Sequence, residues 1–337
     1  MRIIVDAFGG DHAPLEIIKG SAQAHREYGV SILLVGDGER IRAVAGEHEI
    51  PLDGMEIVDC KPVMSVEEDP RSILREQSDS TMAVGLKLLG DGNGDAFVSA
   101  GSTGALVVGG TFLVKRMKGV KRAALAPVMP SATGSYMLLD AGANADCRPD
   151  ALRQFAVMGS SYMEHVMGVV APRVGLVNIG TEETKGRELE LGAYALLQKT
   201  PVNFIGNVEA RSIPLGDCDV VVTDGFTGNI LLKLTEGMGK FFSNSLRDIF
   251  HGVAGKAAGA LVYSRIKTFK KRMDYKEAGG APLMGLAKPV IKAHGSSDAK
   301  AFMNAIRQAK DFAEKDVIGK ISQTLAGLQA AEEGDNA

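Results

Sequence analysis

A loop of glycine and hydroxyl residues interrupts the chain directly after an apolar run. Residues 96–99 (AFVS) lead into Gly101, Ser102, Thr103 and Gly104, after which small and β-branched residues resume. A glycine-rich turn that enters a helix presents backbone N–H groups and the positive end of the helix dipole, which together bind an anion without a lysine. We therefore expect phosphate at this loop. The alternative is that the two glycines only allow a tight turn and close helix packing.

A second polar loop offers a cation. The segment NIGTEETKG carries Asn178, Thr181 and Lys185 between a β-branched run and a predicted helix. An ammonium group at such a strand end can hold phosphate or stabilise a developing oxyanion. The alternative for Lys185 is a solvated surface lysine.

Two more strand ends carry residues that could bind or protonate a substrate. Asp224 ends a run of three valines, and Thr227 and Asn229 follow it at the start of an apolar helix. Helix capping and turn formation would also explain such residues. His294 ends another predicted strand and is a candidate proton carrier or oxyanion donor, with a purely structural histidine as the alternative.

The loop after the first predicted strand, DAFGGDHAP, carries Asp6, Gly9, Asp11 and His12 as further active-site candidates. One histidine and one aspartate without further ligands at the right spacing are poor support for a metal, so we expect none. The sequence also lacks the GxGxxG and GxxxxGK[ST] nucleotide motifs and the GxSxG motif of serine hydrolases. We expect no cofactor.

The elements that must position these loops alternate along the chain. Short β-branched runs are separated by longer amphipathic segments; the runs are RIIVD, SILLVGD, GDAFVSA, SYMLLDA, RVGLVNIG, VNFIGN and DVVVTDG. This alternation predicts an α/β fold with a mostly parallel sheet covered by helices. Ligands bind at the carboxyl ends of parallel strands, so we expect the polar loops to converge on one crevice.

Composition narrows the class of protein. The chain has 337 residues, which fits one large α/β domain over 1–337 or two lobes sharing a sheet, with a disordered tail at 330–337. A net charge of -3 and the absence of Trp argue against a nucleic-acid partner. Three scattered cysteines fit a reducing cytoplasm. The longest apolar run, 105–114, is shorter than the ~20 residues of a membrane span.

The last third of the chain differs from the rest. Residues 236–285 read as a helical excursion before the final strand, and within it residues 254–273 end in a basic run with apolar residues at helical spacing. This pattern favours an acidic protein partner or an anionic membrane surface, and the alternative is a solvated basic helix packed on the core. The candidate contact residues are Arg265, Lys267, Lys270, Lys271 and Arg272.

Several blocks together resemble one family. The blocks DAFGGDHAP, SAGSTGAL, LLDAGAN, NIGTEETKG, GNVEA, DVVVTDGFTGN, GGAPLMG and HGSSDA occur in this order from Asp6 to Ala299. They are similar to those of the phosphate acyltransferase of bacterial phospholipid synthesis. The chain departs from the family pattern at Phe8, Ser102 and Ala278, where the family typically has Met, Asn and Tyr.

The resemblance implies a fold and an activity. The fold is a three-layer, doubly wound, Rossmann-like α/β/α architecture of the isocitrate dehydrogenase and phosphotransacetylase type. The activity is transfer of a long-chain acyl group from acyl carrier protein to inorganic phosphate, whose acyl phosphate product feeds a glycerol-3-phosphate acyltransferase. A cytoplasmic homodimer associated peripherally with the membrane surface is also implied.

The same resemblance suggests residue roles. Residues 101–104 with Lys185 bind phosphate, Asn229 or His294 donates to the oxyanion, and His294 protonates the leaving thiolate. Rival interpretations are a short-chain acetyl-CoA phosphotransferase, a decarboxylating hydroxy-acid dehydrogenase that needs a metal and a nicotinamide, and a catalytically silent membrane adaptor.

Overall fold

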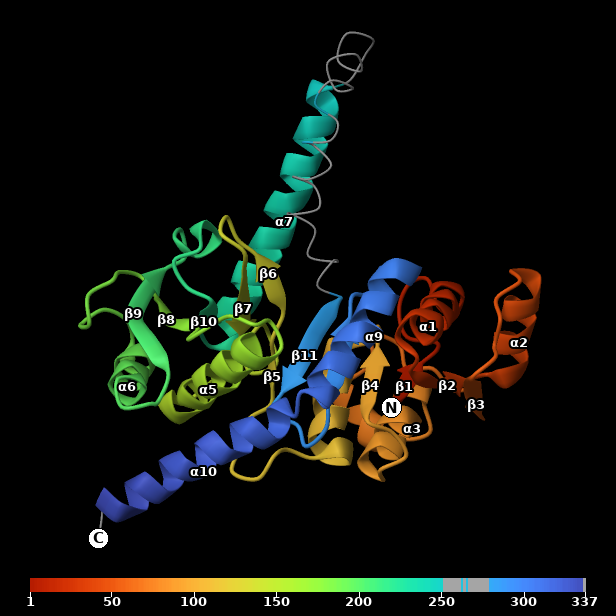
Figure 1. The fold of residues 1–337 in the computed structure, drawn as a ribbon, viewed down its shortest axis with the longest axis horizontal. Helices are drawn as coiled ribbons and strands as arrows, with labels where there is room; N and C mark the ends of the chain where they lie inside the picture. The colour runs from red at the N-terminus through yellow and green to blue at the C-terminus, as the bar shows by residue number, and fades with distance from the viewer. Residues whose placement is uncertain (251–261, 263–264, 266–278, 336–337) are drawn as a thin grey trace.

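The computed structural model describes residues 1–250, 262, 265 and 279–335, and it contains two separate β-sheets surrounded by helices (Figure 1). The predicted α/β class with mostly parallel strands is therefore confirmed, although the strands divide between two sheets.

The first sheet has seven strands and contains both the first and the last strand of the chain. Its order is β3 (Met55–Asp59), β2 (Ser31–Gly36), β1 (Arg2–Asp6), β4 (Ala96–Ser99), β12 (Val290–Ala293), β11 (Gly280–Met284) and β5 (Ala124–Leu125). The strands from β3 to β12 run parallel, whereas β11 is antiparallel to both of its neighbours. The central strands are apolar on both faces because helices cover both faces.

Alternate residues of β1 show this layering. Ile3 and Val5 belong to one buried cluster, with residues of α1 (Leu15–Tyr28) and α9 (Ala299–Glu314). Ile4 belongs to the other cluster, with residues of α3 (Thr81–Gly90) and α4 (Thr103–Gly109). Successive side chains of a strand point to opposite faces, so the helices form two layers around this sheet. A short helix, α2 (Gly38–Glu47), connects β2 to β3.

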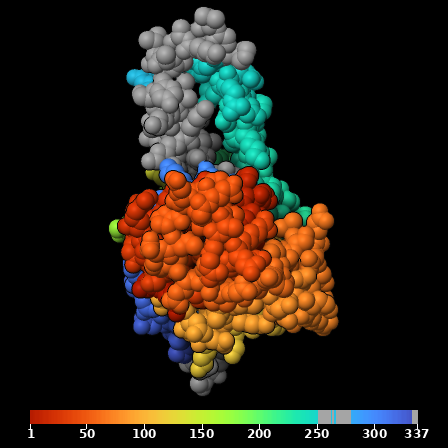
Figure 2. All heavy atoms as spheres, turned by 90° about the vertical axis from the view of Figure 1, so that its right-hand side faces the viewer, coloured from red at the N-terminus to blue at the C-terminus, as the bar shows by residue number. Residues whose placement is uncertain are grey.

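The second sheet has five strands in the order β6 (Val128–Pro130), β7 (Ser135–Leu139), β10 (Val220–Val222), β8 (Arg173–Asn178) and β9 (Asn203–Glu209). Only β6 pairs antiparallel with its neighbour. Helices α5 (Pro149–His165) and α6 (Glu188–Leu197) pack against this sheet. Helix α7 (Gly225–Ile249) begins at the sheet and then extends away from the body of the molecule (Figures 1 and 2).

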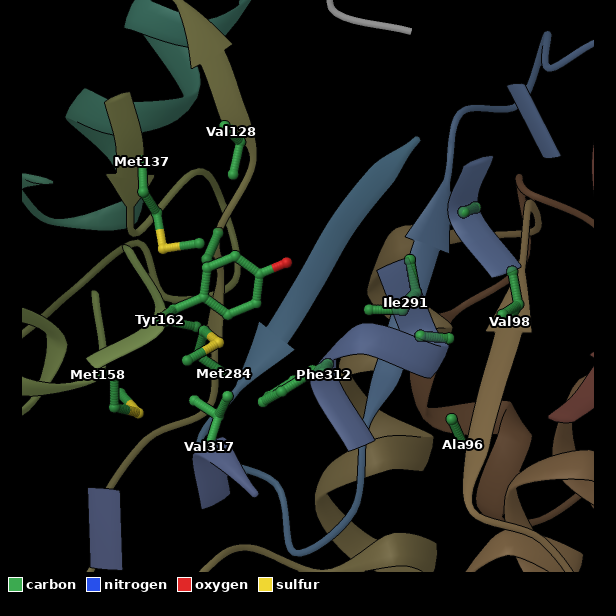
Figure 3. Close-up of a cluster of buried hydrophobic side chains, with 14 of the residues drawn as sticks. Ala96, Val98, Val128, Met137, Met158, Tyr162, Met284, Ile291, Phe312 and Val317 are labelled. Atoms are coloured by element: carbon green, nitrogen blue, oxygen red, sulfur yellow. The ribbon is translucent and has the colours of Figure 1, made fainter. Parts of the chain in front are cut away.

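The buried cluster that contains Ile3 and Val5 extends to both sheets. The Tyr162 ring of α5 meets the Phe312 ring of α9 edge-on, with their centroids 5.5 Å apart. Gln308 Nε2 of α9 also donates a hydrogen bond of 2.9 Å to the Tyr162 hydroxyl. Figure 3 shows this contact beside Met284 of β11 and Val317 of α10 (Val317–Asp335). Burial of these side chains stabilises the relative placement of the sheets.

The end of the chain requires two corrections. Residues 280–284, which we expected in a helical excursion, form strand β11, because their backbone pairs with β12 and β5 and buries Leu283 and Met284. Residues 330–335 of the expected tail belong to helix α10. Between 236 and 249 the chain is helical as expected. Among the described residues, no helix has the length and apolar character to cross a bilayer.

Candidate active site

Residues from several of the predicted polar loops line a pair of neighbouring cavities. We call the first the intersheet cavity; it has a volume of about 290 Å³ and is lined from both sheets. Its main lining residues are Thr103, Gly104, Leu125, Val128, Met129, Ala141, Gly142, Asn229, Leu232, Lys292, His294 and Ser297. Most of this lining is apolar, with the polar groups contributed by the loops and α7.

The second cavity, which we call the first-sheet cavity, has a volume of about 480 Å³. It lies among the loops after β1, β4 and β12. Its polar lining residues are Asp6, Asp11, Thr81, Ser102, Thr103 and Lys292, together with Gly9, Gly10, Gly101 and Gly295. The loops after β1, β4 and β12 therefore meet at this cavity, whereas Gly142 after β7 and Asn229 in α7 line the intersheet cavity. The polar loops thus reach two cavities instead of the one crevice that we expected.

A buried hydrogen-bond chain fixes the β1 and β4 loops. Ser99 Oγ donates to Asp6 Oδ2 at 2.7 Å, and Gly101 N–H donates to Ser99 Oγ at 3.0 Å. Burial raises the pKa of the Asp6 carboxyl. A Cβ on Gly9 would lie 2.6 Å from Asp6 Oδ2, so only glycine fits there. Asp6 and Gly9 thus shape the cavity wall.

Part of the predicted anion loop is satisfied internally. Gly101 N–H already has its Ser99 acceptor, and Ser102 Oγ accepts from Ala105 N–H at 3.4 Å as the cap of α4. The helix that follows this loop, α4, is short, with seven residues. The loop therefore lines the cavities mainly with the Thr103 side chain and with glycine. It does not offer a full set of backbone N–H donors to an anion.

Lys292 of β12 is a residue that the motif analysis missed, and it lines both cavities. Its Nζ donates to Ala100 O at 3.2 Å and also to Ala293 O. The pKa of this lysine is lowered to about 8, mainly by burial and also by the neighbouring Lys233, while Asp11 and Asp6 oppose the shift. The available signal was a lysine inside the otherwise apolar strand sequence VIKA.

His294 follows two residues later and lines the intersheet cavity. Its Nδ1 lies 3.2 Å from Ser296 N and 2.9 Å from Ser296 Oγ. A backbone N–H can only donate, so Nδ1 acts as the acceptor and the neutral ring carries its proton on Nε2.

The loop after β7 is organised by one buried carboxylate. Asp140 accepts hydrogen bonds from the backbone N–H groups of Leu125, Gly142, Ala143 and Asn144, and from the Asn144 side chain. Burial raises the pKa of Asp140. This network places Gly142 beside Asn229, and a Cβ on Gly142 would lie 3.3 Å from Asn229 Oδ1. Both residues line the intersheet cavity.

Asp224 caps a helix, which was the structural alternative to a role in binding. Its Oδ1 accepts from Thr227 N–H at 2.7 Å at the start of α7, and its Oδ2 pairs with Arg187 Nη2 at 2.6 Å. Asp224 is 3 % exposed. Neither Asp224 nor Thr227 is among the described residues that line the two cavities.

The loop after β8 lies outside both cavities in the described part of the chain. Asn178 Nδ2 donates to Lys185 O at 3.0 Å and Asn178 Oδ1 accepts from Ile179 N–H at 2.8 Å, so this amide shapes the loop. The side chains of Lys185 and Thr181 are exposed. His12 is also exposed and is not a cavity residue.

The basic segment is described only at Arg265, which is exposed. Lys267, Lys270, Lys271, Arg272 and Ala278 lie outside the described residues. Within the described ranges, no cluster of His, Cys, Asp and Glu side chains has the arrangement of a metal site.

Solved structures of similar fold include a EutD phosphotransacetylase from Staphylococcus aureus and a phosphotransacetylase from Streptococcus pyogenes. Each has a TM-score of 0.61 and 16% sequence identity, and they cover 94% and 97% of this chain and 94% of their own chains. At this identity the similarity concerns the fold alone, and it agrees with the architecture expected from the sequence.

Residues 1–320 match the family model described as fatty acid synthesis protein. A phosphate acyltransferase from Clostridium botulinum is 47% identical over 330 residues, covering 97% of this chain and 98% of the relative. One from Desulforamulus reducens is 46% identical over 343 residues, covering 99% and 100%. The resemblance seen in the motifs is confirmed, and the chain belongs to this family of phosphate acyltransferases, which are transferase enzymes.

Proposed function

We propose that the protein transfers a long-chain fatty acyl group from acyl carrier protein to inorganic phosphate, which yields acyl phosphate and free carrier protein. The observation that carries this proposal is the pair of cavities, which share Thr103 and Lys292. One cavity is mostly apolar, and the other is lined by hydroxyls, glycines, two carboxylates and a lysine. The phosphate acyltransferase relatives supply the reaction class.

The reaction requires no covalent nucleophile from the enzyme. An oxygen of hydrogen phosphate attacks the thioester carbonyl carbon, and the carbonyl π electrons move to the carbonyl oxygen. Collapse of this oxyanion breaks the C–S bond, and the sulfur leaves with the electron pair. The sulfur then takes up the proton that hydrogen phosphate carried. The enzyme must therefore hold the two reactants together and stabilise the oxyanion.

Two residues of the intersheet cavity are suited to the oxyanion and the proton. Asn229 carries amide N–H donors, and the neutral His294 ring carries a proton on Nε2. We assign oxyanion stabilisation to Asn229 or His294, and protonation of the leaving sulfur to His294, which regains its proton from phosphate. The role of Lys185 in phosphate binding stays a prediction, since its loop lies outside both cavities.

Partners are proposed for the projecting part of the molecule. Helix α7 exposes a stripe of large apolar side chains, namely Phe226, Ile230, Leu234, Met238, Phe241, Phe242 and Ile249. We propose that this face serves a homodimer and that the basic residues of the segment after it serve the acidic carrier protein and a peripheral contact with the membrane. The acyl phosphate would then pass to a glycerol-3-phosphate acyltransferase.

The test is acyl phosphate formation from inorganic phosphate with palmitoyl acyl carrier protein or acetyl-CoA as the donor. Turnover with the carrier-bound palmitoyl group and little with acetyl-CoA is the expected result. Turnover with acetyl-CoA alone would move the protein to the short-chain class, and no turnover with either donor would overturn the proposal.

A further inference from the structure

Two described residues, Thr103 and Lys292, are common to the linings of both cavities. The ammonium of Lys292 is held at this boundary because its Nζ donates to Ala100 O, in the loop between β4 and α4. A cation at this boundary can hold a nucleophile in one cavity close to an electrophile in the other.

We propose that the two cavities divide the substrates: inorganic phosphate binds in the first-sheet cavity against Lys292, and the thioester end of the acyl group enters the intersheet cavity, where Ser297 donates a hydrogen bond to it. This inference rests on the proposed function and adds which residues and which cavity receive each reactant.

The first-sheet cavity has the chemistry of a small anion site. Lys292 is the one Lys or Arg among its described lining residues, and Thr81, Ser102 and Thr103 add hydroxyl groups. Two carboxylates, those of Asp6 and Asp11, also line this cavity. Asp6 receives hydrogen bonds from Ser99 Oγ and from Phe8 N–H. Burial raises the pKa of the Asp6 carboxyl.

The intersheet cavity has the chemistry of an acyl site with a polar end. Its walls include Leu125, Val128, Met129 and Leu232. Ser297 lines the same cavity, is 1 % exposed, and its Oγ has no hydrogen-bond partner among the described residues. A buried hydroxyl without a partner is costly, and a bound carbonyl oxygen would satisfy it.

The N-terminus of α9, next to Ser297, does not compete for phosphate. Its cap carboxylate, Asp298, accepts from Ala301 N–H at 2.8 Å, and Glu16 Oε2 accepts from Ala299 N–H at 2.7 Å. Two acidic groups therefore occupy the positive end of this helix. Phosphate is therefore better placed beside the Lys292 ammonium in the neighbouring first-sheet cavity.

The first experiment measures binding of inorganic phosphate alone, by titration calorimetry at pH 7, to the wild type and to Lys292→Met. We expect the variant to bind phosphate roughly 10-fold to 100-fold more weakly, because it loses a charge-assisted hydrogen bond. Lys288→Met is the matched control: Lys288 precedes the opposite end of β12, and its Nζ likewise donates to a backbone carbonyl, that of Gly94 at 3.1 Å. This control should bind phosphate as the wild type does.

Kinetics separate the two cavities. Lys292→Met should raise KM for phosphate and leave KM for the acyl donor unchanged, and Lys292→Arg should restore part of the phosphate affinity. Ser297→Ala should lower kcat roughly 10-fold with KM for phosphate unchanged. Equal phosphate binding by the wild type and Lys292→Met would overturn the inference while acyl phosphate formation by the wild type left the proposed function intact.

The wild type provides a test that does not depend on whether Lys292→Met folds. Asp6, Asp11 and Lys233 are the charged groups that act on Lys292. With its pKa at about 8, Lys292 loses its charge as the pH rises from 7 to 9, so phosphate affinity should fall over this range. Phosphate affinity that stays constant between pH 7.5 and about 9 would contradict the inference. Phosphate binding without acyl transfer would instead contradict the proposed function alone.

Discussion

The polar loops of the two sheets contain similar residue types but have different environments. In the second sheet, Asp224 is satisfied by Thr227 N–H and Arg187, and Asn178 is satisfied within its own loop. In the first sheet, Lys292 and Ser297 lie on cavity walls, and Ser297 Oγ has no partner among the described residues. Position at a strand end therefore brings residues close together, but it does not decide which of them line a cavity.

The largest expected effect is at Asp140, which lies in the loop after β7 of the second sheet and also accepts a hydrogen bond from Leu125 N–H of the first sheet. Asp140→Ala should lower the free energy of unfolding by roughly 3 kcal/mol, because several buried N–H groups lose their acceptor. Denaturant unfolding measures this loss. Asp91→Ala, at an exposed aspartate after α3, is the control and should change stability by less than roughly 0.5 kcal/mol. A similar small change in Asp140→Ala would show that the network does not organise this loop.

A second prediction concerns the pH dependence of stability in the first sheet. The folded state lowers the pKa of Lys292 to about 8, from 10.5, so the unfolded chain binds more protons between these values. The contribution of this lysine to stability therefore rises as the pH rises through this window. The stability of the wild type relative to Lys292→Met should increase between pH 7 and about 9.5, measured by urea unfolding. If the difference in stability between the wild type and Lys292→Met did not change with pH, the Lys292 ammonium would have to be exposed to water in the folded protein.

A smaller effect is expected for the cap in the second sheet. Asp224→Ala should cost about 1 kcal/mol, mainly from loss of the helix cap, because the Arg187 partner is largely exposed and its ion pair is weak. Asp224→Asn keeps a capping oxygen and should recover most of this loss. KM for phosphate should stay at the wild-type value in both variants. An increase in KM for phosphate would mean that Asp224 belongs to the binding site.

The smallest effect on stability is expected at Lys185. Its side chain is exposed, so Lys185→Ala should change the free energy of unfolding by less than roughly 0.5 kcal/mol. The predicted phosphate contact requires that turnover nevertheless falls, which acyl phosphate assays measure. Unchanged turnover would remove Lys185 from the site and sharpen the contrast between the two sheets.

The sequence predicted those strands that are short apolar runs ending in polar or glycine residues, but it did not predict β3, β5 or β6. Both β1 and β10 follow this rule, and each has a neighbouring strand on both sides. Strand β11 could not be recognised in the same way, because GAPLM contains Gly and Pro and acquires its extended form by pairing with β12 and β5.

The site was less predictable than the fold. The glycine loop at 101–104, Asn229 and His294 were identified as candidates and line the cavities. Lys292 was missed because a lysine inside a strand has no local motif, and its position is set by the parallel pairing of β12 with β4. Whether a polar group is satisfied internally, as Asp224 is, depends on residues far away in the chain, such as Arg187.

The most direct test of the account is the product balance of one reaction, with palmitoyl acyl carrier protein, labelled inorganic phosphate and the wild-type protein. The account predicts one labelled acyl phosphate for each free carrier thiol released. Release of free fatty acid without labelled acyl phosphate would mean that water, and not phosphate, attacks the thioester, and it would contradict the central claim.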